Sequence, residues 1–198
     1  LEARLQLKQP FPDLYAVLTL DDGHASSLRA AEIIAAHKCT ATFFLTRDRS
    51  QNKQGYIRAP EIRELRRLGF SLGTHGTTHR KLTFIPEREC LEELKGSKQW
   101  LEDTIGEPVA SMAAPGGYIN SRVLQQARDC GYRLIGTCNE WMNSPAAMSI
   151  PGPVNRVNIR RHFSEENIRH ILDGSLGFYL WRQARSAALA IPKQIFRN

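Results

Sequence analysis

The sequence has 198 residues, of which 41% are hydrophobic and 24% are charged, and this composition excludes an intrinsically disordered chain. No apolar run approaches the ~20 residues that a membrane-spanning helix needs. The formal net charge of +7 favours an anionic partner. However, the basic residues are scattered and form no zinc-finger, RNA-recognition or basic-zipper pattern, so we expect no nucleic acid partner.

The first half of the chain alternates strand patterns with helix patterns. The β-rich run YAVLTL at 15–20 is followed by helical periodicity over 25–37, and TATFFL at 40–45 again predicts a strand. A polar loop separates this strand from a helix that opens at Pro60 and closes on Gly69.

The second half continues the alternation. FSLG at 70–73 predicts a short strand, residues 87–105 predict one long amphipathic helix, and VASMAA at 109–114 predicts the next strand. The remaining predicted elements are a helix over 120–130, strands over 132–137 and 154–159, a helix after the N-cap Ser164, and a basic amphipathic helix from about 175. That last helix would rest on the protein's own core or on a membrane surface.

Steady alternation of this kind predicts a single α/β domain with a mainly parallel sheet, open or closed into a barrel. In such folds the functional side chains gather where strands end and loops begin. Three motifs that follow strand patterns are therefore the candidates for chemistry.

The first motif is DDG, in which Asp21 and Asp22 follow the first strand run. Successive side chains of a strand point to opposite faces, so the two carboxylates suit two separate roles. A buried pair of carboxylates would also need water or a cation nearby. The alternative is a plain Asp-Gly turn in which Asp22 caps the next helix.

The second motif is HGTTH, with His75 and His79 four residues apart in a Thr- and Gly-rich turn. Two imidazoles at this spacing are typical of metal sites, although such a pair can also be two surface residues. The third motif is PGG at 115–117, whose backbone amides are accessible enough to face an oxyanion. Taken alone, this motif is better interpreted as an ordinary turn.

Taken in order, LTLDDG, ATFFL, FSLGTHGTTH and MAAPGGYIN resemble the polysaccharide deacetylases of carbohydrate esterase family four, the NodB homology domain. The resemblance runs from about Tyr15 to about Thr137. It implies a distorted (β/α) barrel of about seven strands, forming one catalytic domain over 1–198. It also implies a hydrolase of linear amide C–N bonds that removes acetyl groups from N-acetylated sugars with one divalent metal ion, zinc before cobalt or nickel.

Carried over by position, the resemblance gives each motif a role. Asp22, His75 and His79 would be the metal ligands, and Asp21 would be the general base that activates a water molecule. The turn would bind the oxyanion through the Gly116 amide, with Pro115, Gly117 and Trp141 completing the substrate site.

Two positions depart from the family pattern. Ala113 stands where family members often carry an arginine that orients the base, so another group must hold Asp21. The family's late Leu-His pair is also absent, and RVNIRRHFS stands in its place. His162 is the candidate general acid there, with Arg160 as an alternative occupant that would stabilise charge without donating a proton. Trp141, which follows Glu140, matches the family's acidic-Trp motif or is simply a core or rim residue.

These departures leave several functions open. The same scaffold suits an O-acetyl esterase, or an amidase that cleaves non-sugar amides or cyclic imides. A catalytically silent glycan-binding domain is a further alternative. A non-haem iron oxygenase also uses two histidines and one carboxylate, but we rank it last because the adjacent Asp21 supplies a base suited to water activation.

The expected partner is an N-acetylated saccharide or a lipid-linked glycan, with peripheral membrane contact through the C-terminal helix. The four cysteines lack CxxC spacing, and the chain starts at Leu1 without a signal-peptide pattern. Both features favour the cytoplasm, beside the inner membrane where lipid-linked sugars are built, with the periplasm as the alternative.

Overall fold

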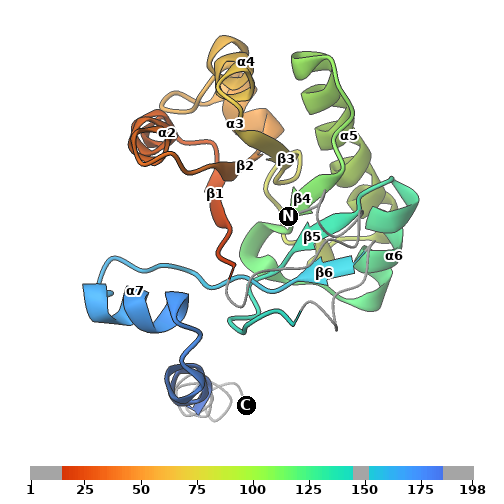
Figure 1. Ribbon diagram of the computed structural model, residues 1–198. Coiled ribbons are helices and arrows are strands. Elements are labelled where there is room, and N and C mark those ends of the chain that lie inside the picture. Colours follow the sequence, from red (N-terminus) through yellow and green to blue (C-terminus); the bar gives the residue numbers. More distant parts are fainter. Residues whose placement is uncertain (1–14, 145–151, 185–198) are drawn as a thin grey trace.

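The computed structural model describes residues 15–144 and 152–184, and its centre is one parallel sheet of six strands. The strands lie side by side in chain order, and the sheet curls into an open half-barrel (Figure 1). Their bounds are β1 (Leu18–Asp22), β2 (Ala41–Leu45), β3 (Ser71–Thr74), β4 (Ser111–Ala113), β5 (Leu134–Gly136) and β6 (Gly152–Val154). The expected α/β barrel-like fold is therefore confirmed, with six described strands against about seven expected.

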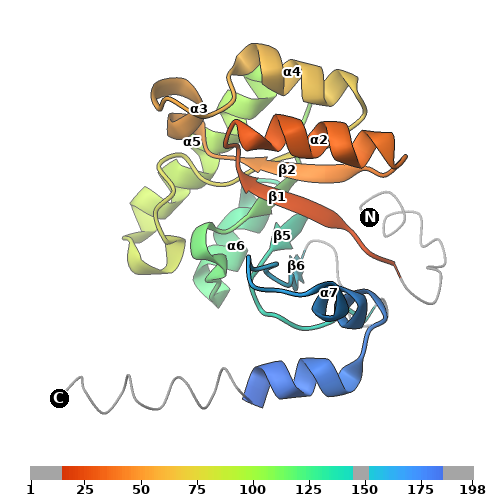
Figure 2. The same cartoon turned by 90° about the vertical axis from the view of Figure 1, so that its left-hand side faces the viewer.

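Helices connect each pair of successive strands from β1 to β5 and cover the outer face of the sheet, as is usual for parallel pairing. Figure 2 shows α2 running along the outside of β1 and β2, with α4 beyond it. The helices are α2 (Ser26–Ala36), α3 (Arg47–Asn52), α4 (Ala59–Arg67), α5 (Glu87–Ile105), α6 (Ser121–Asp129) and α7 (Glu165–Leu172), with the 3-10 turns η1 (Leu82–Phe84) and η2 (Pro115–Gly117). A further helix covers 176–184.

Local sequence signals set several of these boundaries. The carboxamide oxygen of Asn120 accepts a hydrogen bond from the Val123 amide at the start of α6, as an N-cap residue does. Helix α5 begins after Pro86 and ends at Gly106, which adopts the left-handed conformation. The Ser164 hydroxyl caps α7 as the sequence predicted.

Two buried clusters hold the helices on the sheet. In the first, the rings of Phe43 and Phe70 meet edge to face at 5.2 Å, beside Ile62 from α4. In the second, Met112 from β4 packs with Leu94 from α5. Burying side chains of this size contributes roughly 1.5–3 kcal/mol each, so both halves of the curled sheet are anchored.

Three predicted boundaries differ from the structure. The first strand runs on through Asp21 and Asp22 rather than ending before them. The loop expected after Leu45 contains α3, whose first amides, those of Arg47 and Asp48, donate to carbonyls of the 76–77 loop. The late strand ends at Val154, because Asn155 then donates to the Asn143 side chain and leaves the sheet.

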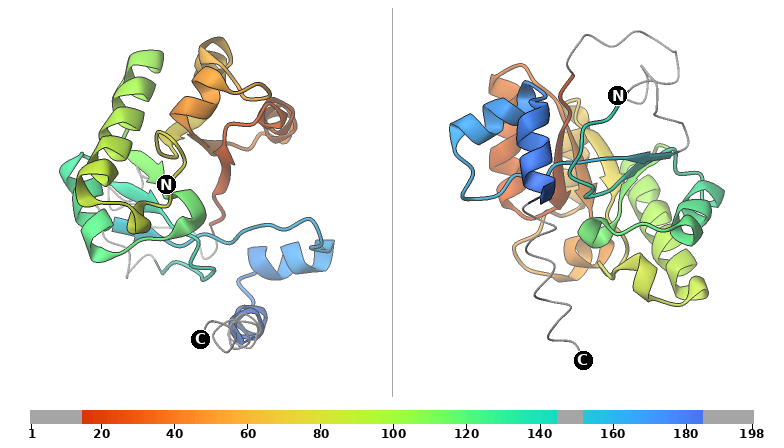
Figure 3. Two further views of the ribbon diagram at one scale, coloured as in Figure 1. Left: turned by 180° about the vertical axis from the view of Figure 1, so that it is seen from behind. Right: turned by 90° about the horizontal axis from the view of Figure 1, so that it is seen from below.

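The chain after β6 leaves the sheet and leads to α7 and the helix at 176–184, which stand apart from the other helices (Figures 1 and 3). The second of these helices lies where the sequence predicted one from about 175, but residues 185–198 of that prediction lie outside the described residues. Within the described ranges, no helix is both long enough and apolar enough to cross a membrane.

Candidate metal centre and active site

Parallel pairing gathers the polar motifs at one edge of the sheet. Asp22, the last residue of β1, is in register with Leu45 of β2, and Leu45 is in register with Thr74 of β3. The next amide, that of His75, donates to the Leu45 carbonyl at 2.8 Å. The carboxylate pair and the first histidine therefore leave neighbouring strand ends at the same height.

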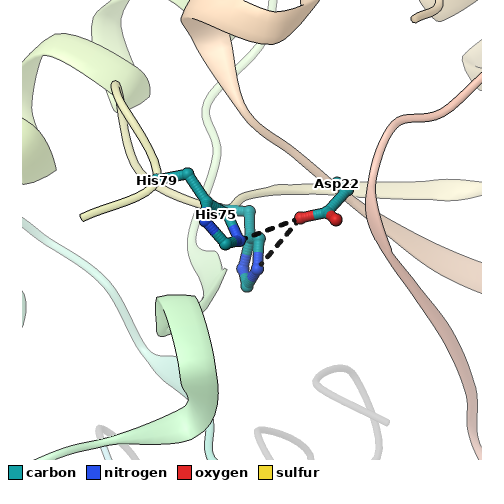
Figure 4. Close-up of side chains that lie close together, drawn as sticks. All are labelled: Asp22, His75 and His79. Atoms are coloured by element: carbon teal, nitrogen blue, oxygen red, sulfur yellow. Dashed lines mark ion pairs between the residues drawn. The ribbon is translucent and has the colours of Figure 1, made fainter. Parts of the chain in front are cut away.

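Asp22, His75 and His79 point toward one another (Figure 4). Asp22 Oδ1 lies 3.0 Å from His79 Nε2 and 3.5 Å from His75 Nε2, and the three ligand atoms all lie within 4.8 Å of one another. Asp22 Oδ1 is buried and makes no hydrogen bond of good geometry within the described part of the chain. A buried anionic oxygen beside two imidazole nitrogens fits a divalent cation with open coordination positions.

The protonation states also suit a metal. Burial alone would raise the pKa of Asp22, but the close contact with His79 and the charges of His75, His79 and Arg49 outweigh it and lower that pKa to about 2. Burial lowers the pKa of His75 by more than nearby Asp21 raises it. Asp22 is therefore anionic and His75 neutral at neutral pH, as metal coordination requires.

Backbone contacts orient the first histidine. His75 Nδ1 lies 2.8 Å from the carbonyl oxygen of Ala113 at the end of β4, and this contact is a hydrogen bond. The carbonyl can only accept, so Nδ1 carries the proton and Nε2 keeps its lone pair for a metal. Ala113 thus contributes through its backbone at the position where the sequence noted a missing arginine.

A buried carboxylate shapes the loop between the histidines. Glu93 of α5 is only 5% exposed and accepts hydrogen bonds from the amides of Thr77 at 2.8 Å and Thr78 at 2.9 Å, as well as from the Thr78 hydroxyl. Glu93 was not among the residues predicted from the sequence. The available signal was its place on the apolar face of α5, one residue before buried Leu94 and three after buried Cys90.

The other carboxylate has a different partner. Arg156, just after β6, donates to both oxygens of Asp21, at 2.7 and 2.9 Å, and also to the Thr137 carbonyl at 3.1 Å. Its side chain is 11% exposed and lies over the Phe44 ring. Such a bidentate pair fixes the plane of the carboxylate. The orienting contact that Ala113 cannot supply therefore comes from Arg156, which the sequence placed only in a scattered basic group.

A second arginine accompanies the metal candidates. Arg49 of α3 lies 2.6 Å from Asp22 Oδ1, so each of the adjacent carboxylates faces its own guanidinium. The sequence predicted a polar loop over this segment and gave Arg49 no role. A short helix of polar residues has no apolar periodicity that could have disclosed it.

The PGG turn lies against the histidine loop. A Cβ on Gly76 would stand 3.3 Å from Pro115, and a Cβ on Gly117 would stand 2.2 Å from that of Cys138, so Gly117 accepts no larger residue. The Gly117 amide donates to the Ala114 carbonyl, whereas Gly116 is exposed with φ 72°. The turn thus offers an exposed glycine beside the candidate metal site.

The late candidates lie elsewhere in the described structure. The ring of Trp141 meets that of Tyr179 at 5.7 Å, and the neighbouring Glu140 pairs with Arg160 and Arg182. His162 is exposed in the turn before α7, with its ring against Phe163. The contacts found within residues 15–144 and 152–184 do not join Trp141 or His162 to the carboxylates or the histidine pair, and their roles stay predictions.

This chain is similar in sequence to known proteins. A family model described as polysaccharide deacetylase matches residues 8–135. A peptidoglycan-N-acetylglucosamine deacetylase of Bacillus cereus is 25% identical over 143 residues, which cover 71% of this chain and 63% of that protein. The chain therefore spans less than two thirds of the length of that curated relative.

Solved structures share the fold. The Streptococcus pyogenes deacetylase PplD, solved in complex with acetate, superposes with a TM-score of 0.77 at 23% identity, over 86% of this chain and 75% of that one. A polysaccharide deacetylase from Bacillus cereus gives a TM-score of 0.70 at 26% identity, over 79% of this chain and 50% of that one.

Proposed function

Because this chain belongs to the polysaccharide deacetylase family, we propose that it is a hydrolase that removes acetyl groups from N-acetylated sugars of a polysaccharide or peptidoglycan. The observation that carries this proposal is the division of labour between two adjacent carboxylates. Asp22 faces two imidazoles in addition to Arg49, whereas both oxygens of Asp21 accept hydrogen bonds from Arg156. The carboxylate beside the imidazoles suits a cation, and the other suits proton transfer.

Asp22, His75 and His79 would hold one divalent metal ion. A carboxylate and two neutral imidazoles are ligands that zinc favours, with cobalt or nickel as alternatives. When bound, the ion supplies Lewis-acid chemistry that acidifies water and polarises the amide carbonyl. Ala113 and Glu93 hold the ligand-bearing loop in place for it.

Asp21 would accept the proton of the attacking water as general base. Its side chain is about one third exposed, and its Oδ2 lies 3.9 Å from His75 Nε2, so the carboxylate borders the metal site and is open to substrate. Arg156 holds the carboxylate plane while leaving further lone pairs of both oxygens for water.

The remaining roles follow the same reaction. The exposed Gly116 amide would donate to the oxyanion of the tetrahedral intermediate. His162 is the candidate acid that protonates the leaving amine. Arg160 cannot take that part at neutral pH, because a guanidinium does not release its proton. Trp141 would line the substrate side.

Acetate release from N-acetylchitohexaose tests the proposal. Protein loaded with Zn²⁺, Co²⁺ or Ni²⁺ should release acetate, while EDTA-treated protein and the Asp21→Asn variant should not. Release from O-acetylated xylan or ring opening of a small imide, with chitohexaose inert, would favour an esterase or amidase. Glycan binding without any product would indicate a silent domain. Oxygen consumption with Fe²⁺ would contradict hydrolysis altogether.

We also propose peripheral membrane contact for the C-terminal region, at the cytoplasmic face of the inner membrane, with a lipid-linked glycan as substrate. The support is a set of leucines on α7 and the following helix that are about half exposed, namely Leu172, Leu176 and Leu180, on a chain of net charge +7. Co-sedimentation with vesicles containing 30% anionic lipid tests this. Equal recovery in the pellet with and without vesicles would contradict it.

A further inference from the structure

Two aromatic side chains stand exposed beside the PGG turn. Phe84, the last residue of η1, is 75% exposed, and Tyr118, directly after η2, is 50% exposed. Their ring centroids lie 6.0 Å apart with an interplanar angle of 81°. Exposing two aromatic rings to water is unfavourable, and neither ring contributes to packing in the core. Exposed aromatic pairs of this kind are therefore typical of binding surfaces.

A lysine completes this patch. Lys81 Nζ lies 4.9 Å from the Tyr118 ring centroid and 5.9 Å from that of Phe84. Lys81 forms no ion pair with a described residue, whereas its neighbour Arg80 pairs with Glu89. The ammonium charge is thus held over two rings and is not neutralised by a carboxylate of the described chain. We call Lys81, Phe84 and Tyr118 the aromatic-lysine patch.

The patch adjoins the proposed reaction centre. Lys81 follows the candidate ligand His79 by two residues. A Cβ on Gly116 would stand 3.2 Å from the Tyr118 ring and 3.5 Å from Lys81 Cε. The same turn therefore presents the proposed oxyanion amide and supports the patch, so a sugar chain with its acetyl group at the metal site would pass over it.

The exposure of Phe84 is built into the fold. Leu82 and Ile85 on either side of it are buried, and Arg122 donates to the carbonyl oxygens of both residues at 3.1 Å. These hydrogen bonds fix the backbone of η1, and the Phe84 side chain remains exposed. A rigid, outward ring loses little entropy when a ligand covers it.

We propose that the aromatic-lysine patch is a substrate subsite for an anionic glycan. A sugar next to the acetylated one stacks the C–H face of its ring on Tyr118 or Phe84, and its carboxylate or phosphate pairs with Lys81. This inference rests on the proposed function, because the patch gains its meaning from the adjacent reaction centre. It narrows the substrate from N-acetylated glycans in general to those that carry negative charge near the acetylated sugar.

Calorimetric titration in EDTA tests the subsite without catalysis. Three probes contain N-acetylglucosamine and differ in charge: neutral N-acetylchitohexaose, a hyaluronan hexasaccharide with carboxylates, and a hexamer of N-acetylglucosamine 1-phosphate. The unmodified protein should bind at least one anionic probe about 3-fold more tightly than the neutral one, since an exposed ion pair contributes little more. Which anionic probe binds more tightly distinguishes carboxylate from phosphate.

Two variants separate charge from stacking. Lys81→Gln should abolish the preference for the anionic probe, and Phe84→Ala should weaken all three probes by about 5-fold through lost stacking. The matched controls are Lys95→Gln on α5 and Leu68→Ala after α4, both at exposed positions, and they should bind as the unmodified protein does. Circular dichroism checks that each variant is folded.

The outcomes separate this inference from the proposed function. Unchanged Kd values in both patch variants, or equal binding of charged and neutral probes by the unmodified protein, would overturn the subsite. Acetate release by the metal-loaded protein is measured independently. If no probe releases acetate but the variants lose binding as expected, the deacetylase proposal fails and the glycan subsite stands.

Discussion

The two halves of the candidate site are built in opposite ways. On the metal side, Asp22, His75 and His79 come from two short motifs at the ends of β1 and β3. On the base side, Asp21 depends on Arg156, which is 135 residues away in the sequence and lies beyond the last strand. Adjacent carboxylates thus acquire different chemistry from the groups that face them, and the two halves can be perturbed separately.

The metal side should be the more sensitive half. Replacing Asp22 by alanine removes the only carboxylate of the ligand set, so we expect bound metal to fall from about one ion to almost none and deacetylation to fall at least ~1000-fold. Elemental analysis after dialysis and acetate release measure the two effects. Asp103→Ala on the exposed face of α5 is the control. Full metal content in the Asp22 variant would refute the assignment.

Removing the contact between Arg156 and Asp21 should reduce activity without loss of bound metal. In Arg156→Met, Asp21 loses its bidentate partner, so we expect kcat to fall about 100-fold while metal content stays unchanged. Arg156→Lys should recover only part of kcat, because an ammonium group does not form two parallel hydrogen bonds in the plane of a carboxylate. If KM rises with kcat unchanged, Arg156 binds substrate instead of orienting the base.

Glu93 acts on the metal side through the loop that carries the histidines. In Glu93→Gln, one end of the side chain becomes a donor facing the Thr77 and Thr78 amides, so the loop loses accepted hydrogen bonds. We expect metal affinity to drop about 10-fold and the melting temperature to fall by several degrees. Chelator competition and calorimetry measure these changes. Glu92→Gln, exposed and adjacent, should change neither.

Tyr132 should affect stability more than catalysis. Its hydroxyl donates to the Leu94 carbonyl and lies 2.8 Å from the Thr74 hydroxyl, next to His75, so Tyr132→Phe should cost about 1 kcal/mol of unfolding free energy. Burial raises the pKa of Tyr132. The unfolded chain therefore releases this proton first as pH rises, and the folded protein loses stability above roughly pH 10.

The Tyr132→Phe variant lacks that titration. The difference in unfolding free energy between this variant and the unmodified protein should therefore shrink above roughly pH 10. Urea unfolding at pH 8 and pH 10.5 measures the difference. Tyr118→Phe, at a half-exposed ring, is the matched control. A difference in unfolding free energy that grows with pH would contradict a raised pKa of Tyr132.

The grouping of the three candidate metal ligands could be predicted from the sequence because its pattern is local. His75 and His79 are four residues apart, Asp22 follows an apolar strand, and alternation of strands and helices places all three at one sheet edge. Arg156 could not be found this way. The partner of Arg156 depends on how far the sheet curls and on where the chain leaves β6. The periodicity of hydrophobic residues predicts neither feature.

Arg49 and Glu93 were missed for different reasons. The α3 segment is polar throughout, and its helix is fixed by carbonyls of another loop, which is a tertiary effect. Glu93 looked like an ordinary charge on a long amphipathic helix, yet it faces inward. The roles of Trp141 and His162 stay predictions.

The contact between Arg156 and Asp21 also has a consequence for the order of folding. It joins the first strand to the segment after the last one and closes a loop of 135 residues. Contacts of such large sequence separation carry a high closure cost and form late. A nascent chain would assemble the candidate metal ligands first, and the proposed base would be aligned only once β6, the last described strand, is in place. Hydrolytic competence would thus mark completion of the fold.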